Sequence, residues 1–387
     1  MVDRPLWRER LAAAWRQAPI VWLAGPRRVG KTMLARQLPQ ARFLNCDLPS
    51  VGERLADPES FYRSVAEPVV VFDEVHQLAD PSRLLKIGAD VFPRLKLLAT
   101  GSSTLAATRK FHDSLTGRKR VVNLVPVLYR ELPAFGVHDL RVRLWRGGLP
   151  SVLLGQHGPA EFFGEWIDSY YARDVQELFH VGKRAGFLRV FELLLRQSGG
   201  LLDVSRIAAE SEISRPTVTH WLEVFQVTQT LHVVRPYAAG GRREIVAQPK
   251  VFGFDTGLVC HVRGWEELRN DDCGPLWEHL VLDTFIAAGE AAIHYWRDKQ
   301  HHEVDFVLPR GRHGVDAVEC KWNPKSFEPR GLLAFRERYP QGRNFVLCPT
   351  EGEPYDKTVA GLEVRFLSPA QWPPAGVGPR MPPGARR

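Results

Sequence analysis

Short apolar runs alternate with stretches of helical spacing along the N-terminal third of the chain. The strand-like runs are Ile20–Ala24, Arg42–Cys46, Val69–Phe72, Leu95–Thr100 and Val121–Val125. Between them the apolar residues follow the spacing of a helix with one buried face. Strands that alternate with helices are typical of a parallel sheet covered by helices. We therefore predict an α/β domain over residues 1–150.

The pattern changes twice in the rest of the chain. From Glu161 to Phe225 apolar residues keep helical spacing without strand-like runs, whereas a mixed α/β pattern resumes at Val251 and ends near Leu367. The final stretch is rich in Pro and Gly. The predicted parts are an α/β domain 1–150, a helical and winged-helix region 151–250, a second α/β domain 251–367 and a disordered tail 368–387.

Composition narrows the class of protein. The 387 residues are 44% hydrophobic and 25% charged, which is ordinary for globular domains and excludes a largely disordered or fibrous chain. The apolar runs are far shorter than the roughly 18 residues of a membrane span, and the first residues lack the features of a secretory signal. The five cysteines are scattered and form no CxxC pair. We expect a cytoplasmic protein with reduced thiols and no membrane partner.

The net charge of +8 comes from the N-terminal part of the chain. Residues 1–150 hold 24 Lys and Arg against 14 Asp and Glu, whereas residues 151–387 hold 28 against 30. A basic surplus favours polyanionic partners. Because this surplus coincides with a phosphate-binding motif, it does not separate ATP from nucleic acid.

That motif follows the first predicted strand and fits the pattern GxxxxGK[ST]. The residues expected to contact ATP are Gly25, Pro26, Arg27, Arg28, Val29, Gly30, Lys31 and Thr32. The glycines let backbone N–H groups surround the phosphates, while Lys31 reaches the β and γ oxygens and the Thr32 hydroxyl binds Mg²⁺. A glycine-rich turn that binds nothing is the alternative. The motif predicts ATP and Mg²⁺ as cofactors.

Paired carboxylates end the apolar strand Val69–Phe72. Asp73 is placed to hold the Mg²⁺ shell, and Glu74 is placed to polarise the attacking water as a catalytic base. An acidic strand end is by itself commonly only a transition into a loop. Because this one follows a phosphate-binding loop after one intervening strand and helix, it favours a hydrolytic site.

Two later segments carry candidate contacts to the γ-phosphate. Thr100 to Ser103 end the next strand, where ligands of open α/β sheets bind, and Ser102 is an expected contact. Turn formation alone also explains these hydroxyls. Arg118 follows a glycine and is a candidate arginine finger that would act on a neighbouring copy in a homo-oligomer. An ordinary exposed arginine is the alternative.

These motifs resemble those of prokaryotic AAA-type ATPases that carry a C-terminal domain of unknown function. The likeness rests on Gly25–Thr32, Asp73-Glu74, Thr100–Ser103, Ser114–Arg118, Gly147–Pro150 and Lys250–Leu258. The chain departs from that family at His76, where Gln is usual, and at Thr116, where Ala is usual. The resemblance implies a P-loop NTPase fold with nucleotide binding and hydrolysis, and it leaves the biological task open.

The middle region contains a helix-turn-helix pattern. Asp203 and Ser214 are candidate caps of two helices, and Leu231–Val234 with Glu244–Ala247 would form a wing. The candidate DNA contacts are Arg215, Thr217, Thr219, His220, Arg242 and Arg243. Residues 201–250 hold six basic and five acidic residues. This weak charge favours a packing or lid role over contact with DNA.

Carboxylates gather in the last predicted domain. Glu278 lies on an apolar helix face, Asp305 lies on a strand, and Glu319 and Lys321 share one face of the next strand. If the strands pair, three carboxylates meet one lysine, and two carboxylates about 4 Å apart repel by roughly 4 kcal/mol near a protein surface. A divalent cation would neutralise the excess negative charge of such a cluster.

The order of these elements resembles the restriction-endonuclease-like α/β core. The resemblance implies that Asp305 and Glu319 bind Mg²⁺, that Lys321 orients water or stabilises developing charge, and that Glu278 supports the metal. The alternative is a core without nuclease activity, in which Glu319 and Lys321 only pair with each other.

Three functions are compatible with these features. The first is a Mg²⁺-dependent ATPase whose nucleotide state controls a nuclease-like or nucleic-acid-binding C-terminal domain. The second is a non-catalytic, nucleotide-switched regulatory or scaffold protein that holds a partner protein, DNA or RNA. The third is a nucleic-acid processing enzyme that uses ATP as a gate. ATP turnover separates the first from the second, and metal-dependent cleavage identifies the third.

Overall fold

The chain divides into two units that do not follow the sequence continuously. The computed structural model describes residues 2–101, 115–176, 179, 181–238, 248–350 and 352–374. Unit 1 consists of residues 1–125, 167–180 and 227–230, and unit 2 consists of the remaining residues. Because the chain leaves unit 1 after Val125 and returns to it twice, this division differs from the predicted boundaries at 150 and 250.

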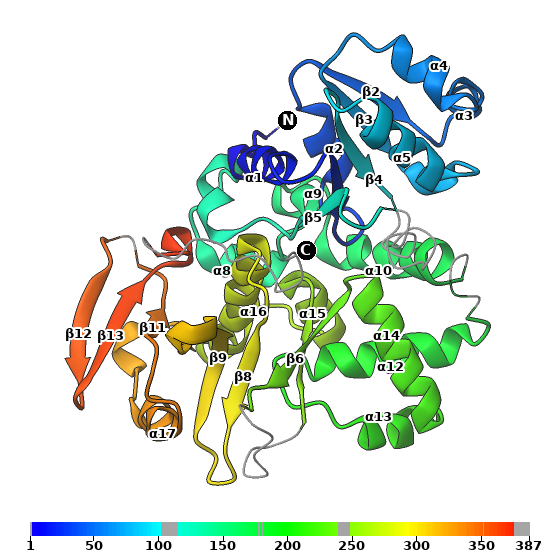
Figure 1. The fold of residues 1–387 in the computed structure, drawn as a ribbon. Coiled ribbons are helices and arrows are strands. Elements are labelled where there is room, and N and C mark those ends of the chain that lie inside the picture. Colours follow the sequence, from blue (N-terminus) through cyan, green and yellow to red (C-terminus); the bar gives the residue numbers. More distant parts are fainter. Residues whose placement is uncertain are drawn as a thin grey trace. The chain divides into compact units, whose positions relative to one another are not determined.

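A parallel five-stranded sheet forms the centre of unit 1 (Figure 1). Its strands lie in the order β2-β3-β4-β1-β5. The elements are α1 (Pro5–Trp15), β1 (Ile20–Ala24), α2 (Lys31–Arg36), β2 (Ala41–Asn45), α3 (Pro49–Arg54), α4 (Pro58–Arg63), β3 (Val69–Asp73), α5 (Pro81–Val91), β4 (Lys96–Thr100) and β5 (Lys119–Asn123). Each predicted strand is present, with its bounds within two residues of those expected.

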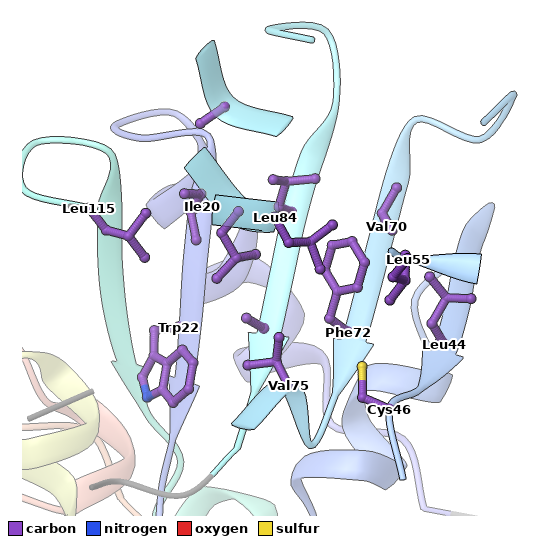
Figure 2. Packing of buried hydrophobic residues seen from close by; sticks show 14 of the residues in the cluster. Ile20, Trp22, Leu44, Cys46, Leu55, Val70, Phe72, Val75, Leu84 and Leu115 are labelled. Atoms are coloured by element: carbon purple, nitrogen blue, oxygen red, sulfur yellow. The ribbon is translucent and has the colours of Figure 1, made fainter. Parts of the chain in front are cut away.

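Apolar side chains bury both faces of this sheet. On one face, Ile20 and Trp22 of β1 and Phe72 of β3 belong to the same core as Leu84 of α5 (Figure 2). The intervening residues of β1, including Val21 on the opposite face, are also fully buried. Strands that are buried on both faces are continuous apolar runs rather than alternating ones. This explains the continuous apolar runs of the central strands β1, β3 and β4, whereas the edge strands β2 and β5 are only partly buried.

Unit 2 contains helices and a mixed eight-stranded sheet, with strands in the order β12-β13-β11-β10-β9-β8-β6-β7. Its first part consists of a 3₁₀ segment (Tyr129–Phe135), α8 (Leu140–Arg146), α9 (Pro150–Leu153), α10 (Pro159–Tyr170), α12 (Arg184–Arg196), α13 (Val204–Ser211), α14 (Arg215–Val227), β6 (Leu231–Pro236) and β7 (Lys250–Gly253). The end of α10, from Ile167 on, and Val227 at the end of α14 are counted with unit 1. The second part consists of α15 (Thr256–Arg263), α16 (Asn270–Ala288), β8 (His294–Arg297), β9 (Glu303–Pro309), β10 (Val315–Cys320), α17 (Arg330–Arg338), β11 (Asn344–Leu347), β12 (Tyr355–Val359) and β13 (Leu362–Leu367).

The predicted helix-turn-helix elements are present as α13 and α14. The Asp203 carboxylate accepts hydrogen bonds from the first turn of α13, and the Ser214 hydroxyl accepts one from the Thr217 N–H. The following strand β6 pairs with β7 and also with β8, so it belongs to the same sheet as the C-terminal elements. The predicted boundary at residue 250 therefore does not separate two sheets. Residues 244–247 of the predicted wing lie outside the described part of the chain.

The first residues of the predicted disordered tail are ordered. A 3₁₀ turn spans Pro369–Gln371, and the Trp372 side chain is buried with its Nε1 donating to Glu290. Arg130 also donates to the backbone oxygens of Ala370 and Trp372. The prediction was wrong for residues 368–374. It was based on Pro and Gly content, whereas the buried Trp372 side chain holds this segment in place. Residues 375–387 lie outside the described part.

The described helices include none that is long and apolar enough to span a membrane.

A buried histidine gives unit 2 a measurable dependence on pH. His279 of α16 is 3% exposed, and its ring nitrogens bond the Ser198 hydroxyl and the Pro275 carbonyl oxygen. Burial lowers the pKa of His279 from 6.5 to about 3. Between pH 6.5 and pH 3, His279 is therefore protonated in the unfolded chain but neutral in the folded chain. Stability is therefore full above pH 6.5 and falls with decreasing pH across this window.

We expect this histidine to cost about 2 kcal/mol of unfolding free energy at pH 5 relative to pH 7. Urea unfolding at both pH values would show a smaller loss in His279→Gln than in the wild-type chain. The exposed His220 provides the control, because His220→Gln leaves the pH dependence unchanged. Equal pH dependence of wild type and His279→Gln would contradict the expectation.

Candidate functional site

The loop after β1 has the shape of a phosphate cradle. Gly25 approaches the backbone so closely that a Cβ would lie 2.3 Å from the Leu124 carbonyl oxygen, and Gly30 adopts a left-handed conformation before α2. Both positions therefore require glycine. The Lys31 ammonium points into the loop and donates to the carbonyl oxygens of Gly25 (2.7 Å) and Pro26 (2.9 Å). Burial lowers the pKa of Lys31.

The Asp73 carboxylate joins three elements at the carboxyl edge of the sheet. Its Oδ1 accepts hydrogen bonds from the hydroxyls of Thr100 at the end of β4 (2.6 Å) and Thr32 of α2 (3.2 Å). Asp73 is 4% exposed. Strand β4 lies between β1 and β3, so the end of β4 is next to both the phosphate loop and Asp73. The Thr32 hydroxyl and Asp73 carboxylate are hard oxygen donors, which fit Mg²⁺.

Glu74 follows Asp73 in a left-handed backbone conformation, with φ of 56°. Such a conformation is uncommon for a residue other than glycine and often occurs at functional sites. Its N–H donates to the Thr100 hydroxyl (3.1 Å), and its carboxylate lies 3.3 Å from His76 Nδ1. Burial raises the pKa of Glu74, while Lys31 and His76 oppose this effect. A carboxylate with a raised pKa is suited to accept a proton from water.

Two other nucleotide contacts were predicted, Ser102 and Arg118. Ser102 lies outside the described residues. Arg118 makes two hydrogen bonds to Asp90 and precedes β5. Its carbonyl oxygen accepts from the N–H of Ile20, the first residue of β1, whereas the phosphate loop follows the last. Arg118 thus lies roughly 16 Å from the phosphate loop of its own chain, and only its action on a second copy stays a prediction.

A residue that the sequence did not reveal reaches the phosphate loop from far along the chain. The Asp174 carboxylate lies 2.9 Å from the Arg27 guanidinium, 147 residues away in sequence. Both side chains are partly buried, with exposures of 22% for Asp174 and 27% for Arg27. Asp174 also stabilises the charged form of Lys31, which raises the pKa of that amine against the effect of burial. No local motif marks such a residue, because its role depends on how the chain returns to unit 1.

The predicted C-terminal cluster is also assembled in the structure. Lys321 Nζ lies 2.8 Å from Glu319 Oε2 and 3.7 Å from Asp305 Oδ2, and the Cys320 N–H donates to Asp305 (2.7 Å). Burial and the nearby Asp305 raise the pKa of Glu319 to about 8. Glu278 lies on α16, as predicted, and this helix begins at Asn270. Its first turn is stabilised by Asp272, which accepts a hydrogen bond from the Arg269 N–H.

This cluster contains basic groups that the sequence prediction did not count. Lys250 of β7 is 4% exposed and lies 2.5 Å from Glu303 Oε1 and 3.4 Å from Glu278 Oε2. Arg297 of β8 lies 3.2 Å from the other oxygen of Glu303. Burial opposes the charge on Lys250, but the surrounding carboxylates outweigh it and raise the pKa of Lys250. Four carboxylates therefore face three basic groups, rather than three facing one.

Within the described residues, no group of three or more His, Cys, Asp or Glu side chains is arranged to hold a metal ion. Oxygen donors of the right type for Mg²⁺ are present at Asp305 and Glu319. A cation bound there would depend on additional ligands, such as water or phosphate oxygens. Lys250 and Arg297 already neutralise part of the negative charge of the cluster. A metal ion is therefore less needed there than the sequence predicted.

The candidate DNA contacts on α14 have local roles in the structure. The Thr217 hydroxyl bonds that of Ser214, and the Thr219 hydroxyl donates to the Arg215 carbonyl oxygen. The side chains of Arg215 and His220 are exposed. Arg242 and Arg243 lie outside the described residues. Contact with DNA stays a prediction, and the local hydrogen bonds are those expected of an ordinary helix start.

Three consecutive parts of the chain match models of known protein families. Residues 17–133 match a family model described as an AAA domain. Residues 137–269 and 273–364 match two models that are each described as a domain of unknown function, DUF8612 and DUF4143. The N-terminal part is therefore similar to an AAA domain, which supports the nucleotide binding expected from the motifs. The restriction-endonuclease-like assignment of the C-terminal part stays a prediction.

The chain is also similar to individual proteins, two of which are described only as uncharacterized. Uncharacterized proteins of Mycobacterium bovis and Mycobacterium tuberculosis are each 27% identical over 344 residues, which cover 85% of this chain and 74% of theirs. Among solved structures, the Walker-type ATPase PABY2304 of Pyrococcus abyssi is 16% identical with a TM-score of 0.42, covering 68% of this chain and 96% of that one.

Lys250 is expected to be essential for the stability of unit 2. Replacing it by methionine leaves Glu278 and Glu303 without their shared cation, and breaking a buried ion pair in this way typically costs about 3–5 kcal/mol. Urea unfolding of Lys250→Met would measure the loss. Arg365→Met is the control, because the Arg365–Asp356 pair is exposed and its loss costs about 1 kcal/mol or less. Similar losses in both variants would contradict a special role for Lys250.

Proposed function

We propose that the chain is a Mg²⁺-dependent ATPase whose nucleotide state controls its C-terminal domain. The observation that carries this proposal is the Asp73 carboxylate shared by Thr32 and Thr100, with Glu74 beside it. Phosphoryl transfer needs positioning, charge neutralisation and a group that orients water. All three are supplied by residues that meet at one edge of the parallel sheet.

Each residue has a distinct part in hydrolysis. The loop amides and the Lys31 ammonium bind the phosphate oxygens, and Thr32 with Asp73 would hold Mg²⁺. The metal supplies additional neutralisation of the phosphate charge. Glu74 orients the attacking water and accepts its proton, while Thr100 fixes the position of both Asp73 and Glu74. His76 holds the Glu74 carboxylate from the other side.

Two substitutions separate binding from hydrolysis. Lys31→Ala removes the phosphate-binding amine and is expected to abolish ATP binding in isothermal titration calorimetry. Glu74→Gln keeps the shape of the side chain but cannot accept a proton, so ATP binding persists while phosphate release falls at least about 100-fold. Lys86→Ala, at an exposed position of α5, is the control and behaves like wild type. Normal turnover in both site variants would overturn the proposal.

For the C-terminal domain, the arrangement of Asp305, Glu319 and Lys321 supports a metal-dependent nuclease-like site. Two carboxylates on adjacent strands with a lysine between them are suited to hold a divalent cation beside a phosphate group. The basic groups Lys250 and Arg297 favour a second candidate. A cluster that is nearly neutral without metal is compatible with a regulatory or scaffold domain that binds DNA, RNA or a partner protein without cleaving it.

Cleavage assays decide between these candidates. The full chain is incubated with linear, plasmid and single-stranded DNA and with RNA, with Mg²⁺ or Mn²⁺, with and without ATP. A nuclease requires cleavage by wild type and by the exposed control Asp356→Asn, and its loss in Asp305→Asn. Absence of cleavage under every condition supports the second candidate. Cleavage that persists in Asp305→Asn contradicts the assignment of this site.

A further inference from the structure

We propose that Asp174 is a counter-ion for the phosphate loop that bound nucleotide displaces, and that this displacement loosens the turn Tyr171–Gln176. The inference rests on the proposed binding of ATP and adds a residue that the phosphate-loop motif does not contain. Asp174 lies in the segment Tyr171–Gln176, which forms a π-helical turn directly after α10. Such turns are rare and occur frequently at functional sites.

Bound nucleotide and Asp174 would compete for Arg27. This arginine belongs to the phosphate loop, where bound nucleotide would place several negatively charged oxygens. Its guanidinium lies 2.9 Å from the Asp174 carboxylate, which also lies close enough to Lys31 to stabilise its charge. Phosphate oxygens and a carboxylate are acceptors of the same kind for a guanidinium. Two such anions beside the same cations repel each other, so ATP binding and the Arg27–Asp174 pair oppose one another.

Four residues before Asp174, Tyr170 is held in place by hydrogen bonds, which we call the anchor. The buried Tyr170 hydroxyl bonds the hydroxyls of Thr228 (2.9 Å) and Thr230 (3.2 Å). Between these two threonines, Gln229 donates to Asn123 at the end of β5 (2.9 Å). These hydrogen bonds join neutral groups, so phosphate oxygens do not compete for them as they compete for Arg27. The segment is thus held at one end by neutral hydrogen bonds and four residues later by a charge pair.

This arrangement makes a two-state element. With the pair intact, the segment is fixed at Tyr170 and at Asp174. When phosphate oxygens take over Arg27, this charge pair is lost, whereas the anchor at Tyr170 and the buried side chains of Tyr171 and Val175 remain. The turn Tyr171–Gln176 is then less restrained at Asp174. Linkage requires the reciprocal effect, because an interaction that ATP breaks must also weaken ATP binding. Removing the Asp174 charge is therefore expected to strengthen ATP binding.

The test compares Asp174→Asn with a matched charge pair in the same unit. Arg42 and Glu67 form a pair of similar length (3.0 Å) and similar exposure (23% and 33%) outside the nucleotide site. Isothermal titration calorimetry with ATP is expected to give an affinity about fivefold or more higher for Asp174→Asn, at the lower end of usual coupling between sites. Glu67→Gln is expected to bind ATP like wild type, and AMP is expected to show a smaller gain than ATP in Asp174→Asn.

Hydrogen exchange of the segment provides a second measurement that does not depend on affinity. In the wild-type chain, ATP is expected to speed exchange of residues 171–176, whereas in Asp174→Asn exchange is already fast without ATP and does not change further. Unchanged or weaker ATP affinity in Asp174→Asn, or equal gains in Glu67→Gln, would overturn the inference while leaving ATP binding itself intact. Absence of ATP binding by the wild-type chain would instead refute the proposed function.

Discussion

The proposed nucleotide site is held together by one carboxylate that joins three elements. Asp73 at the end of β3 accepts hydrogen bonds from Thr32 of α2 and Thr100 of β4. This is possible because parallel strands end at the same edge of a sheet and because β4 lies between the phosphate-loop strand and the carboxylate strand. Thr100 then accepts from the Glu74 N–H. The candidate base is therefore positioned through the same carboxylate that would hold the metal.

The balance of charge distinguishes the two candidate sites. At the proposed nucleotide site, the Lys31 ammonium is partly buried, and within the described residues its hydrogen bonds go to backbone carbonyl oxygens, which leaves its charge available for phosphate anions. In the C-terminal cluster, Glu278, Glu303, Asp305 and Glu319 face basic groups that already lie within 4 Å of them. A cation entering this cluster must compete with buried amines, which is costly in a poorly hydrated environment. A lysine near carboxylates is therefore available for a phosphate group at the first site, whereas at the second site the lysines are already paired with carboxylates.

The sequence was informative where chemistry is local and uninformative where it is not. The phosphate loop, Asp73-Glu74 and the strands that carry them lie in short continuous segments with apolar runs, and each was located from its pattern. Asp174 and Lys250 have no such pattern, although each lies within hydrogen-bonding distance of a predicted site residue. His76 was noticed only as a departure from a family, and the structure shows that it touches Glu74.

The sequence by itself determined the parallel-sheet fold of the N-terminal domain and the position of its glycine-rich loop, because buried parallel strands and such a loop each require particular residues in consecutive positions. It also determined the helix caps at Asp203 and Ser214, which act over three or four residues. Only the tertiary structure decided which charges meet. The return of the chain to unit 1 brings Asp174 to Arg27, and the pairing of β6 with both β7 and β8 places Lys250 among carboxylates from other elements. Ion pairs depend on distance in space, which sequence separation does not encode.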